Sequence, residues 1–303
     1  MTAAGDLRSR LSRHVTVDGT FATPFDGVQL FRVSAPVERL PGVYSPSVCV
    51  IVQGTKHAYF DGRAHRYDSS HYLCATMPLP VEAEIRDASP EHPVLGLLIS
   101  FESRTVTELM VRLRAVLPQP ATAAVPDHGL LVAPWGDDFT ATLERMLDLL
   151  DDEVALDLLG PGRLQELLYA ILVGPAGPTI RRTLGGAAQH LGGVLTYIRN
   201  HLDEPLAVDD LAQRAGMSRA AFDRHFKATT SMSPLQYLKA LRLNDAALLI
   251  VNGTDITRAA AAVGYTSPSQ FSREFKRHVG STPRAWANAH RGAADPQAVA
   301  LTA

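Results

Sequence analysis

The strongest constraint on the fold is a phrase that occurs twice in the last third of the chain. GMSRAAFDRHFKATT (216–230) and GYTSPSQFSREFKRHV (264–279) both contain Phe-x-x-x-Phe-Lys. Four positions match at a constant displacement of 49 residues: Phe222 with Phe271, Phe226 with Phe275, Pro234 with Pro283, and Tyr237 with Trp286. A displacement that stays constant over several positions indicates an internal repeat.

Each copy has the pattern of a helix, a short turn and a second helix. The small-residue stretches DDLAQRAG and TRAAAAVG end at Gly216 and Gly264, and glycine readily adopts the left-handed conformation that closes a helix. Ser218 and Ser267 then stand where a side chain caps the next helix, and Pro268 follows at its first position. This order predicts two helix-turn-helix modules.

The second helix of each copy has one apolar face and one polar face. At about 100° per residue, the paired phenylalanines share a stripe that is predicted to face the core. The opposite face carries short polar and cationic side chains, which suit the base edges and phosphates of a DNA major groove. The predicted DNA contacts are Arg219, Ala220, Asp223, Arg224 and Lys227 in the first copy, and Ser267, Ser269, Gln270, Ser272, Arg273, Lys276 and Arg277 in the second. For Lys227, Lys276 and Arg277, a solvated surface is the alternative.

A single helix is predicted between the two copies. Ser233 is placed to cap it, Pro234 begins it, and the apolar stretch continues to about Val251. Such a helix is roughly 27 Å long, and successive major-groove faces of B-DNA are roughly 34 Å apart. We therefore expect this connecting helix to hold the two polar faces so that one chain contacts two adjacent grooves.

The charge of the chain is unevenly distributed. The formal net charge is −2, but residues 1–186 carry 16 Lys and Arg against 22 Asp and Glu, whereas residues 187–290 carry 12 against 8. This division predicts that only the back part contacts a polyanion. No apolar run reaches the roughly 18 residues of a membrane span, and the start lacks the apolar core of a secretory signal. Two cysteines fit a reducing compartment. We expect a cytoplasmic protein with no membrane partner.

The first part of the chain is rich in strand patterns. Short β-branched or aromatic runs suit a sandwich or barrel: VCVIVQG, KHAYF, RAHRY, HYLCA, PVEAEI and PVLGLLIS. Asp61-Gly62 predicts a type I′ turn and a hairpin over residues 56–67. Apolar residues at helical spacing over 104–117 and 139–172 predict helices that pack beside the barrel or against a second copy.

Gly and Pro are dense in VGPAGPTIRRTLGGAAQHLGG (173–193), which predicts a linker. The predicted organisation is a two-domain α+β protein. Its parts are a β-barrel with flanking helices over residues 1–173, the linker over 174–193, an all-α domain with two helix-turn-helix modules over 194–290, and a disordered tail over 291–303.

The back part resembles the AraC/XylS-type transcription regulators. LAQRAGMSRAAFDRHFKATTSMSPLQYLKALRL and VGYTSPSQFSREFKRHVGSTP are similar to the two helix-turn-helix modules of that family. YSPSVCVIVQGTKHAYFDGRAHRYDSSHYLCATMPLPVEAEI is similar to the N-terminal domain of one branch, and ILVGPAGPTIRR is similar in its place before the DNA module. The resemblance covers nearly all of residues 20–290. It implies a cupin-like effector or dimerisation domain, a helical contact in a homodimer, and activation or repression through RNA polymerase at promoter DNA.

Four positions depart from the family pattern. Ser231 stands where the family often has Gly, so a helix end is expected at some conformational cost. Ala247 and Leu248 stand on the connecting helix where the family often has an Arg-rich stretch, which suggests that the front domain docks there. Ala220 is smaller than the residue that relatives often place toward the groove, which weakens the case for base readout by the first module.

Metal-dependent or nucleophilic catalysis is not supported by the sequence. A cupin-type metal site needs two His that are two residues apart on one strand face, and the 11 His contain no His-x-His pair. With a simple hairpin register, Arg66 lies opposite His57 and His65 lies opposite Ala58, so the two His side chains point to different faces. No nucleophile-and-base motif or phosphate loop is present. We expect no catalytic residue, no metal and no cofactor.

A small barrel can enclose one small ligand. The candidate effector contacts among the strands are Tyr44, Cys49, His57, Tyr59, His71 and Cys74. For each of them, a satisfied core residue is the alternative. The two cysteines are either thiolate sensors of an electrophile or oxidant, or small buried hydrophobic residues.

The sequence thus predicts a sequence-specific DNA-binding transcription regulator, an activator, that responds to a small-molecule effector through its N-terminal domain. Two other hypotheses stay open, namely an effector-independent DNA-binding protein and a cupin-like enzyme with an accessory DNA-binding module. A ligand screen by melting temperature separates the first alternative from the prediction, and an assay for bound metal with turnover separates the second.

Overall fold

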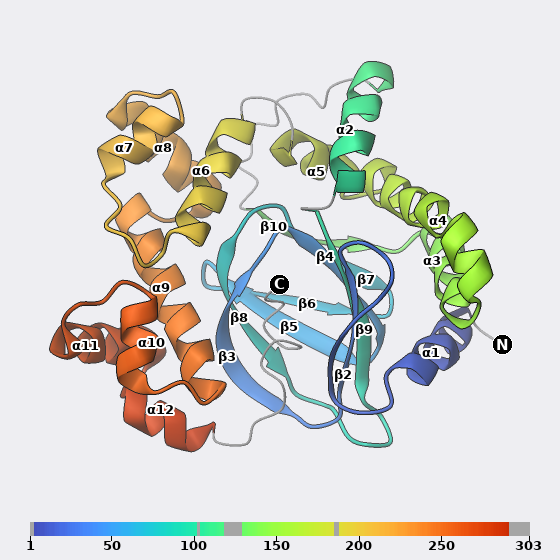
Figure 1. Ribbon diagram of the computed structural model, residues 1–303, viewed down its shortest axis with the longest axis horizontal. Coiled ribbons are helices and arrows are strands. Elements are labelled where there is room, and N and C mark those ends of the chain that lie inside the picture. The colour runs from blue at the N-terminus through green and yellow to red at the C-terminus, as the bar shows by residue number, and fades with distance from the viewer. Residues whose placement is uncertain (1–2, 102–103, 118–128, 185–187, 291–303) are drawn as a thin grey trace.

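The computed structural model describes residues 3–101, 104–117, 129–184 and 188–290. A curled antiparallel sheet forms a half-barrel at the centre, with one group of helices on each side of it (Figure 1). The sheet has the order β1-β2-β9-β4-β7-β6-β5-β8-β3, and β10 pairs with β7. Its strands are β1 (Gly19–Ala22), β2 (Val28–Val33), β3 (Val37–Tyr44), β4 (Ser47–Gln53), β5 (Thr55–Phe60), β6 (Arg63–Asp68), β7 (His71–Ala75), β8 (Leu79–Ile85), β9 (Val94–Ser100) and β10 (Leu130–Pro134).

The helices fall into two groups, on the right and the left of Figure 1. The right-hand group is α1 (Ala3–His14), α2 (Arg104–Val116), α3 (Asp137–Asp148), the short 3-10 helix η1 (Leu149–Asp151), α4 (Glu153–Val173) and α5 (Gly177–Leu184). The left-hand group is α6 (Ala188–Asn200), α7 (Val208–Arg214), α8 (Arg219–Thr230), α9 (Pro234–Val251), α10 (Ile256–Ala262), α11 (Pro268–Val279) and α12 (Pro283–Ala289). Within these described ranges, no helix is long and apolar enough to cross a membrane.

The predicted hairpin is confirmed in its turn and its register. Asp61 and Gly62 have φ angles of 51° and 71°, as a type I′ turn requires. His57 pairs with Arg66 and Ala58 pairs with His65 across β5 and β6. His57 and His65 therefore lie on opposite faces of the sheet, because side chains alternate along a strand.

Strand β4 is buried on both faces, which explains its continuous apolar sequence. Cys49 and Ile51 belong to the core cluster inside the half-barrel, whereas Val48, Val50 and Val52 belong to a second cluster, shared with α1 to α5. The helices on the right thus cover the convex side of the sheet.

The segment predicted as a linker is largely helical. Helix α5 (Gly177–Leu184) lies within residues 174–193, and helix α6 begins at Ala188. The density of Gly and Pro predicts that helices end on either side of this segment. Helix α5 nevertheless forms within it, because Pro178 is the second residue of α5, a place where a missing backbone N–H is tolerated. The domain limits remain a prediction, and the predicted disordered tail, 291–303, lies outside the described residues.

The repeat folds as two helix-turn-helix modules joined by α9. Helices α7 and α8 form the first module, α10 and α11 form the second, and α9 has the predicted bounds. Gly216 and Gly264 take the left-handed conformation, with φ of 65° and 82°. Ser231 ends α8 with φ of 60°, so the expected helix end without Gly is confirmed.

Helix α9 also docks on the barrel, as the apolar pair Ala247 and Leu248 suggested. It packs on β3 and β8, and its buried side chains form one continuous cluster with the inside of the half-barrel and with the cores of both modules. The Tyr237 hydroxyl donates to the Pro78 carbonyl at 2.5 Å, and the Asn244 amide donates to the Gly42 carbonyl at 2.7 Å.

The two turn glycines make a matched pair for a stability test. A Cβ at Gly264 would lie 2.8 Å from the Leu202 carbonyl oxygen and 2.9 Å from that of Asp203, whereas a Cβ at Gly216 would meet nothing within 4 Å. We expect Gly216→Ala to lower the free energy of unfolding by about 1 kcal/mol, through backbone strain alone. Gly264→Ala must in addition displace the Leu202 and Asp203 backbone, so it should lower the free energy of unfolding by roughly 2–4 kcal/mol. Urea unfolding measures both, and equal losses would contradict the close approach at Gly264.

Candidate nucleic-acid interface

The paired phenylalanines hold both second helices against the core in the same way. Their side chains are buried, with exposed fractions of 0% for Phe222, Phe226 and Phe275 and 1% for Phe271. The ring centroids within each pair are 5.3 Å apart in α8 and 5.4 Å apart in α11. The aligned residues Tyr237 and Trp286 each pack edge-on against the second ring of the pair. Burial of this stripe turns the opposite face of each helix outward.

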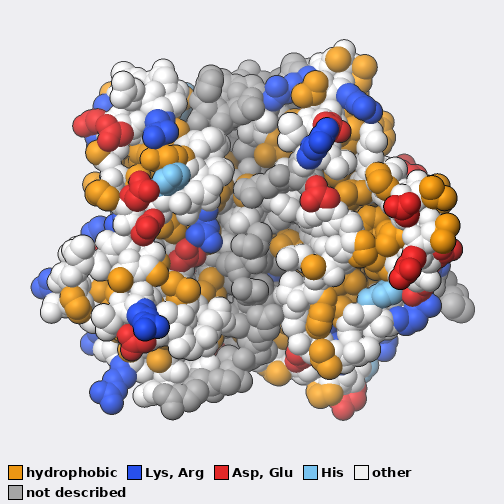
Figure 2. Space-filling model, in the orientation of Figure 1, with side chains coloured by type: hydrophobic (Ala, Val, Ile, Leu, Met, Phe, Trp, Pro, Cys, Tyr) orange, Lys and Arg blue, Asp and Glu red, His pale blue; other side chains and the backbone are white. Residues whose placement is uncertain are grey.

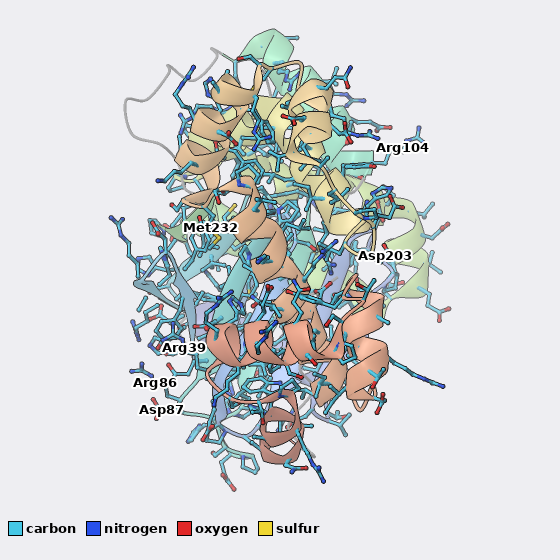
Figure 3. The ribbon with its side chains drawn as sticks, turned by 90° about the vertical axis from the view of Figure 1, so that its left-hand side faces the viewer. Arg39, Arg86, Asp87, Arg104, Asp203 and Met232 are labelled. Carbon is cyan, nitrogen blue, oxygen red and sulfur yellow. The ribbon has the colours of Figure 1, made fainter. Side chains whose placement is uncertain are left out.

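Side-chain caps begin both helices where the sequence predicts. The Ser218 hydroxyl accepts from the Ala221 amide, and the Ser267 hydroxyl accepts from the Gln270 amide, at 3.4 Å and 3.3 Å. Ser267, one of the predicted DNA contacts, is therefore already engaged as a cap and is half-buried. Helices α8 and α11 both lie on the side of the molecule that faces the viewer in Figure 3.

The outward face of α8 combines free cations with an ion-pair network. Arg224 and Lys227 are exposed, as is Ala220. Arg219 instead bonds Asp209 at 2.8 Å and Asp223 at 3.0 Å, and these contacts raise its pKa. The Arg219–Asp209 bond therefore joins α8 to α7, and Asp223 bonds Arg219 within α8. Arg224 and Lys227 are the cations of α8 that form no ion pair with a described residue.

The outward face of α11 is more cationic. Arg273, Lys276 and Arg277 are exposed and form no ion pair with a described residue, and Ser269 and Ser272 lie exposed among them. The single acid of α11, Glu274, is turned to the side of the helix. It bonds Lys239, the Tyr265 hydroxyl and, at 3.3 Å, the predicted contact Gln270. The Tyr265, Lys239 and Gln270 bonds lower the pKa of Glu274, although burial opposes them.

The six candidate effector residues do not lie together. Tyr44 and Cys49 are buried inside the half-barrel, whereas Cys74 lies in the cluster on the convex side. His57 and Tyr59 lie on the outer face, where the Tyr59 hydroxyl donates to Glu84 and Arg39 stacks 3.9 Å above the ring. Figure 3 labels Arg39 and Arg86 of this outer surface. His71 is exposed.

Two residues inside the half-barrel were missed from the sequence. Lys56 and Tyr67 are paired across β5 and β6 and are fully buried beside Tyr44 and Cys49. The Lys56 ammonium lies 5.4 Å and 5.9 Å from the ring centroids of Phe31 and Tyr44. The Asp61-Gly62 register contained the signal, because it places Lys56 on the face of β5 opposite to His57.

Burial sets the protonation of this interior cluster. It lowers the pKa of Lys56 to about 8, which the nearby Cys49 partly offsets. It raises the pKa of the Cys49 thiol, although Lys56 acts in the opposite direction, and it raises the pKa of Cys74. Both thiols therefore stay protonated at neutral pH, which favours the interpretation of buried hydrophobic residues over that of thiolate sensors. In the part of the chain that the structure describes, no group of three or more His, Cys, Asp or Glu residues could hold a metal ion.

Models of two protein families match the sequence and show the family to which the chain belongs. The model of the AraC-type transcriptional regulator N-terminus matches residues 24–179, and a helix-turn-helix domain model matches residues 211–289. The chain belongs to the AraC-type transcriptional regulators. The resemblance drawn from the two modules is thereby confirmed, and the family consists of regulators rather than enzymes.

Curated relatives carry regulatory names. The chain is 29% identical over 155 residues to the HTH-type transcriptional regulator ArgR of Pseudomonas aeruginosa, which is 50% of this chain and 47% of the relative. It is 32% identical over 130 residues to the MmsAB operon regulatory protein of the same organism, which is 43% of this chain and 40% of the relative. The chain thus spans less than half the length of these relatives.

One solved structure shares the whole architecture. ToxT from Vibrio cholerae superposes with a TM-score of 0.58 at 11% sequence identity, and the match covers 86% of this chain and 97% of ToxT. At that identity the likeness concerns the fold alone. It supports the predicted fold, in which a β-barrel domain with flanking helices precedes an all-α helix-turn-helix region.

The exposed arginines give the sharpest test of the two outward faces. We expect Arg224→Ala and Arg273→Ala each to weaken binding to a cognate DNA site roughly 5- to 150-fold, because one arginine contact to a base is worth about 1–3 kcal/mol. Lys227→Ala should weaken binding to all sequences and flatten the salt dependence. Electrophoretic mobility shifts over a salt series measure these effects, with Arg112→Ala on α2 as a control far from the modules. Unchanged affinity in both arginine variants would remove the assignment of these faces.

Proposed function

We propose that this AraC-type regulator binds promoter DNA in a sequence-specific manner through α8 and α11, its two recognition helices. The observation that carries the proposal is the duplication itself, in which two capped helices have the same buried stripe, expose cations and lie on the same side of the molecule. The 18 residues of α9 correspond to about 27 Å of helix. That length suits recognition helices that enter adjacent major grooves.

The N-terminal half-barrel is proposed to bind a small-molecule effector in its interior. The candidate contacts are Lys56, Tyr44 and Tyr67, because they bring an ammonium and two hydroxyls to one fully buried place beside Cys49. Buried polar groups that converge in this way suit a small polar ligand. Thermal unfolding with candidate ligands measures this step, and a library that never shifts the melting temperature would favour the effector-independent alternative.

A homodimer is proposed through the outer face of α4. Large apolar side chains remain exposed along this helix, with exposed fractions of 71% for Val154, 73% for Leu158 and 49% for Tyr169. They recur at helical spacing, and Figure 2 shows hydrophobic and acidic side chains at the right-hand edge, where α3 and α4 lie. A groove of about 760 Å³ between α3 and the end of α4 continues this face past Tyr169. Exposed large apolar side chains of this kind, here interspersed with charged ones, are typical of an association surface.

The remaining partners follow from the family. We infer that the protein acts in the cytoplasm, where promoter DNA is present, and that it activates transcription by contacting RNA polymerase. Run-off transcription from a cognate promoter, with and without the protein, measures this step. A fall in transcript would show a repressor instead.

The experiment that tests DNA recognition is selection from a pool of random double-stranded DNA by the full-length protein. The expected result is a consensus with two half-sites about one helical turn apart. A footprint on the selected site should lose one half-site in Arg224→Ala and the other in Arg273→Ala. A pool that stays random after selection would refute the proposed function.

The proposed dimer predicts an effect of charge on α4. Leu158→Glu places a carboxylate in the apolar face and should raise the dimer dissociation constant at least tenfold, since about 1.4 kcal/mol is tenfold in affinity. Val111→Glu on α2, where the side chain is 64% exposed outside this face, is the matched control and should leave the constant unchanged. Sedimentation equilibrium measures both. A wild-type chain that is monomeric at every concentration would contradict the proposal.

A further inference from the structure

One polar side chain lies in the middle of the contact between α9 and the barrel. Tyr237, Leu241, Asn244 and Leu248 recur every three or four residues along α9, and all four are buried. Asn244 is only 2% exposed. A buried amide is destabilising unless it is fully hydrogen-bonded, so its partners show what the position does.

Both ends of the Asn244 amide are bonded, and to different domains. Nδ2 donates to the Gly42 carbonyl on β3 at 2.7 Å, and Oδ1 lies 2.7 Å from His278 Nε2 on α11. A carbonyl only accepts, so the amide must present Nδ2 to Gly42, which leaves Oδ1 to accept from the His278 ring. These bonds connect β3, α9 and α11 through one side chain.

The end of α11 also faces the barrel. His278 stands in the last turn of α11, together with Lys276 and Arg277. Partial burial lowers the pKa of His278, and Glu82 on β8 of the barrel opposes that shift. Nε2 can donate to Asn244 in both the neutral and the protonated ring, so the bond itself is not a pH switch.

We propose that Asn244 is a positioning residue that couples the barrel to the second recognition helix. Any change in the Gly42 segment of β3 moves the Asn244 amide, and with it the His278 end of α11. The inference rests on the proposed function in so far as α11 contacts DNA. It goes beyond that function because it assigns the path by which the barrel acts on one module and not on the other.

The first module has no equivalent connection in the described residues. The nearest counterpart is Tyr237 of α9, whose hydroxyl donates to the Pro78 carbonyl of the barrel. The ring of Tyr237 packs edge-to-face with Phe226 of α8, with 5.2 Å between centroids. A hydrogen-bonded connection fixes orientation, whereas an apolar ring contact permits sliding. Coupling through Asn244 should therefore act on α11 before α8.

Reciprocity gives the test, because coupling between two sites acts equally in both directions. Hydrogen-exchange mass spectrometry on the DNA-free full-length protein compares the wild type with Asn244→Leu, His278→Leu, His278→Gln and Tyr237→Phe. His278→Leu changes a side chain of α11 alone, yet it should speed exchange in the β3 peptides around Gly42 about tenfold, as loss of one hydrogen bond implies. His278→Gln keeps a donor for Asn244 and should behave as wild type. Tyr237→Phe is the matched control, which loses a barrel bond without affecting α11.

A DNA measurement then separates the coupling from the proposed function. On a site selected by the wild type, Asn244→Leu and His278→Leu should each reduce discrimination at the second half-site about tenfold and leave the first unchanged, and the double variant should be no worse than either single. Three results would each overturn the inference. They are unchanged β3 exchange in His278→Leu, equal exchange rates in His278→Gln and His278→Leu, and equal losses of discrimination at both half-sites. A wild type that selects no DNA refutes the proposed function instead, and the exchange data alone then decide the coupling.

Discussion

The structure depends on the packing of one helix, α9, against three partners at once. It closes the core of both helix-turn-helix modules and docks on β3 and β8 of the half-barrel. The Ser233 capping box and Pro234 begin it sharply, which fixes where the first module ends. Because α9 is shared, neither module nor the barrel can shift without repacking it. The length of α9, and not a flexible connection, therefore sets the distance between the two recognition helices.

The two copies of the repeat have specialised at the same aligned position. Trp286 donates to the Ala247 carbonyl within the DNA-binding region, whereas Tyr237 donates to the Pro78 carbonyl of the barrel. The first copy thus supplies a hydrogen bond to the N-terminal domain, whereas the Trp286 indole N–H of the second copy bonds within the helical region. The same asymmetry appears on the outer faces, since Arg219 of α8 is held by Asp209 and Asp223 while the cations of α11 remain exposed.

Local sequence signals predicted much of the fold, but they did not predict contacts between residues that are far apart in the sequence. Turn and cap chemistry placed the Asp61-Gly62 hairpin, Ser233 and the bounds of α9, because these depend on neighbours in the chain. Helix α5 within the predicted linker was not foreseen, although Pro is tolerated in a first helical turn. Lys56 and Asn244 were missed, since their meaning comes from partners that the fold brings together, although an amide within the apolar stripe of α9 was a visible signal.

The central claim is that α9 rigidly spaces two DNA-reading helices. The most direct measurement is the affinity of the full-length protein for its selected site after insertion of five or ten base pairs between the half-sites. Five base pairs turn the second half-site to the opposite side of the duplex, and ten restore its side but move it about 34 Å away. A rigid α9 predicts that both insertions reduce affinity to that of a single half-site. Retained affinity with the ten-base-pair insertion would contradict the account.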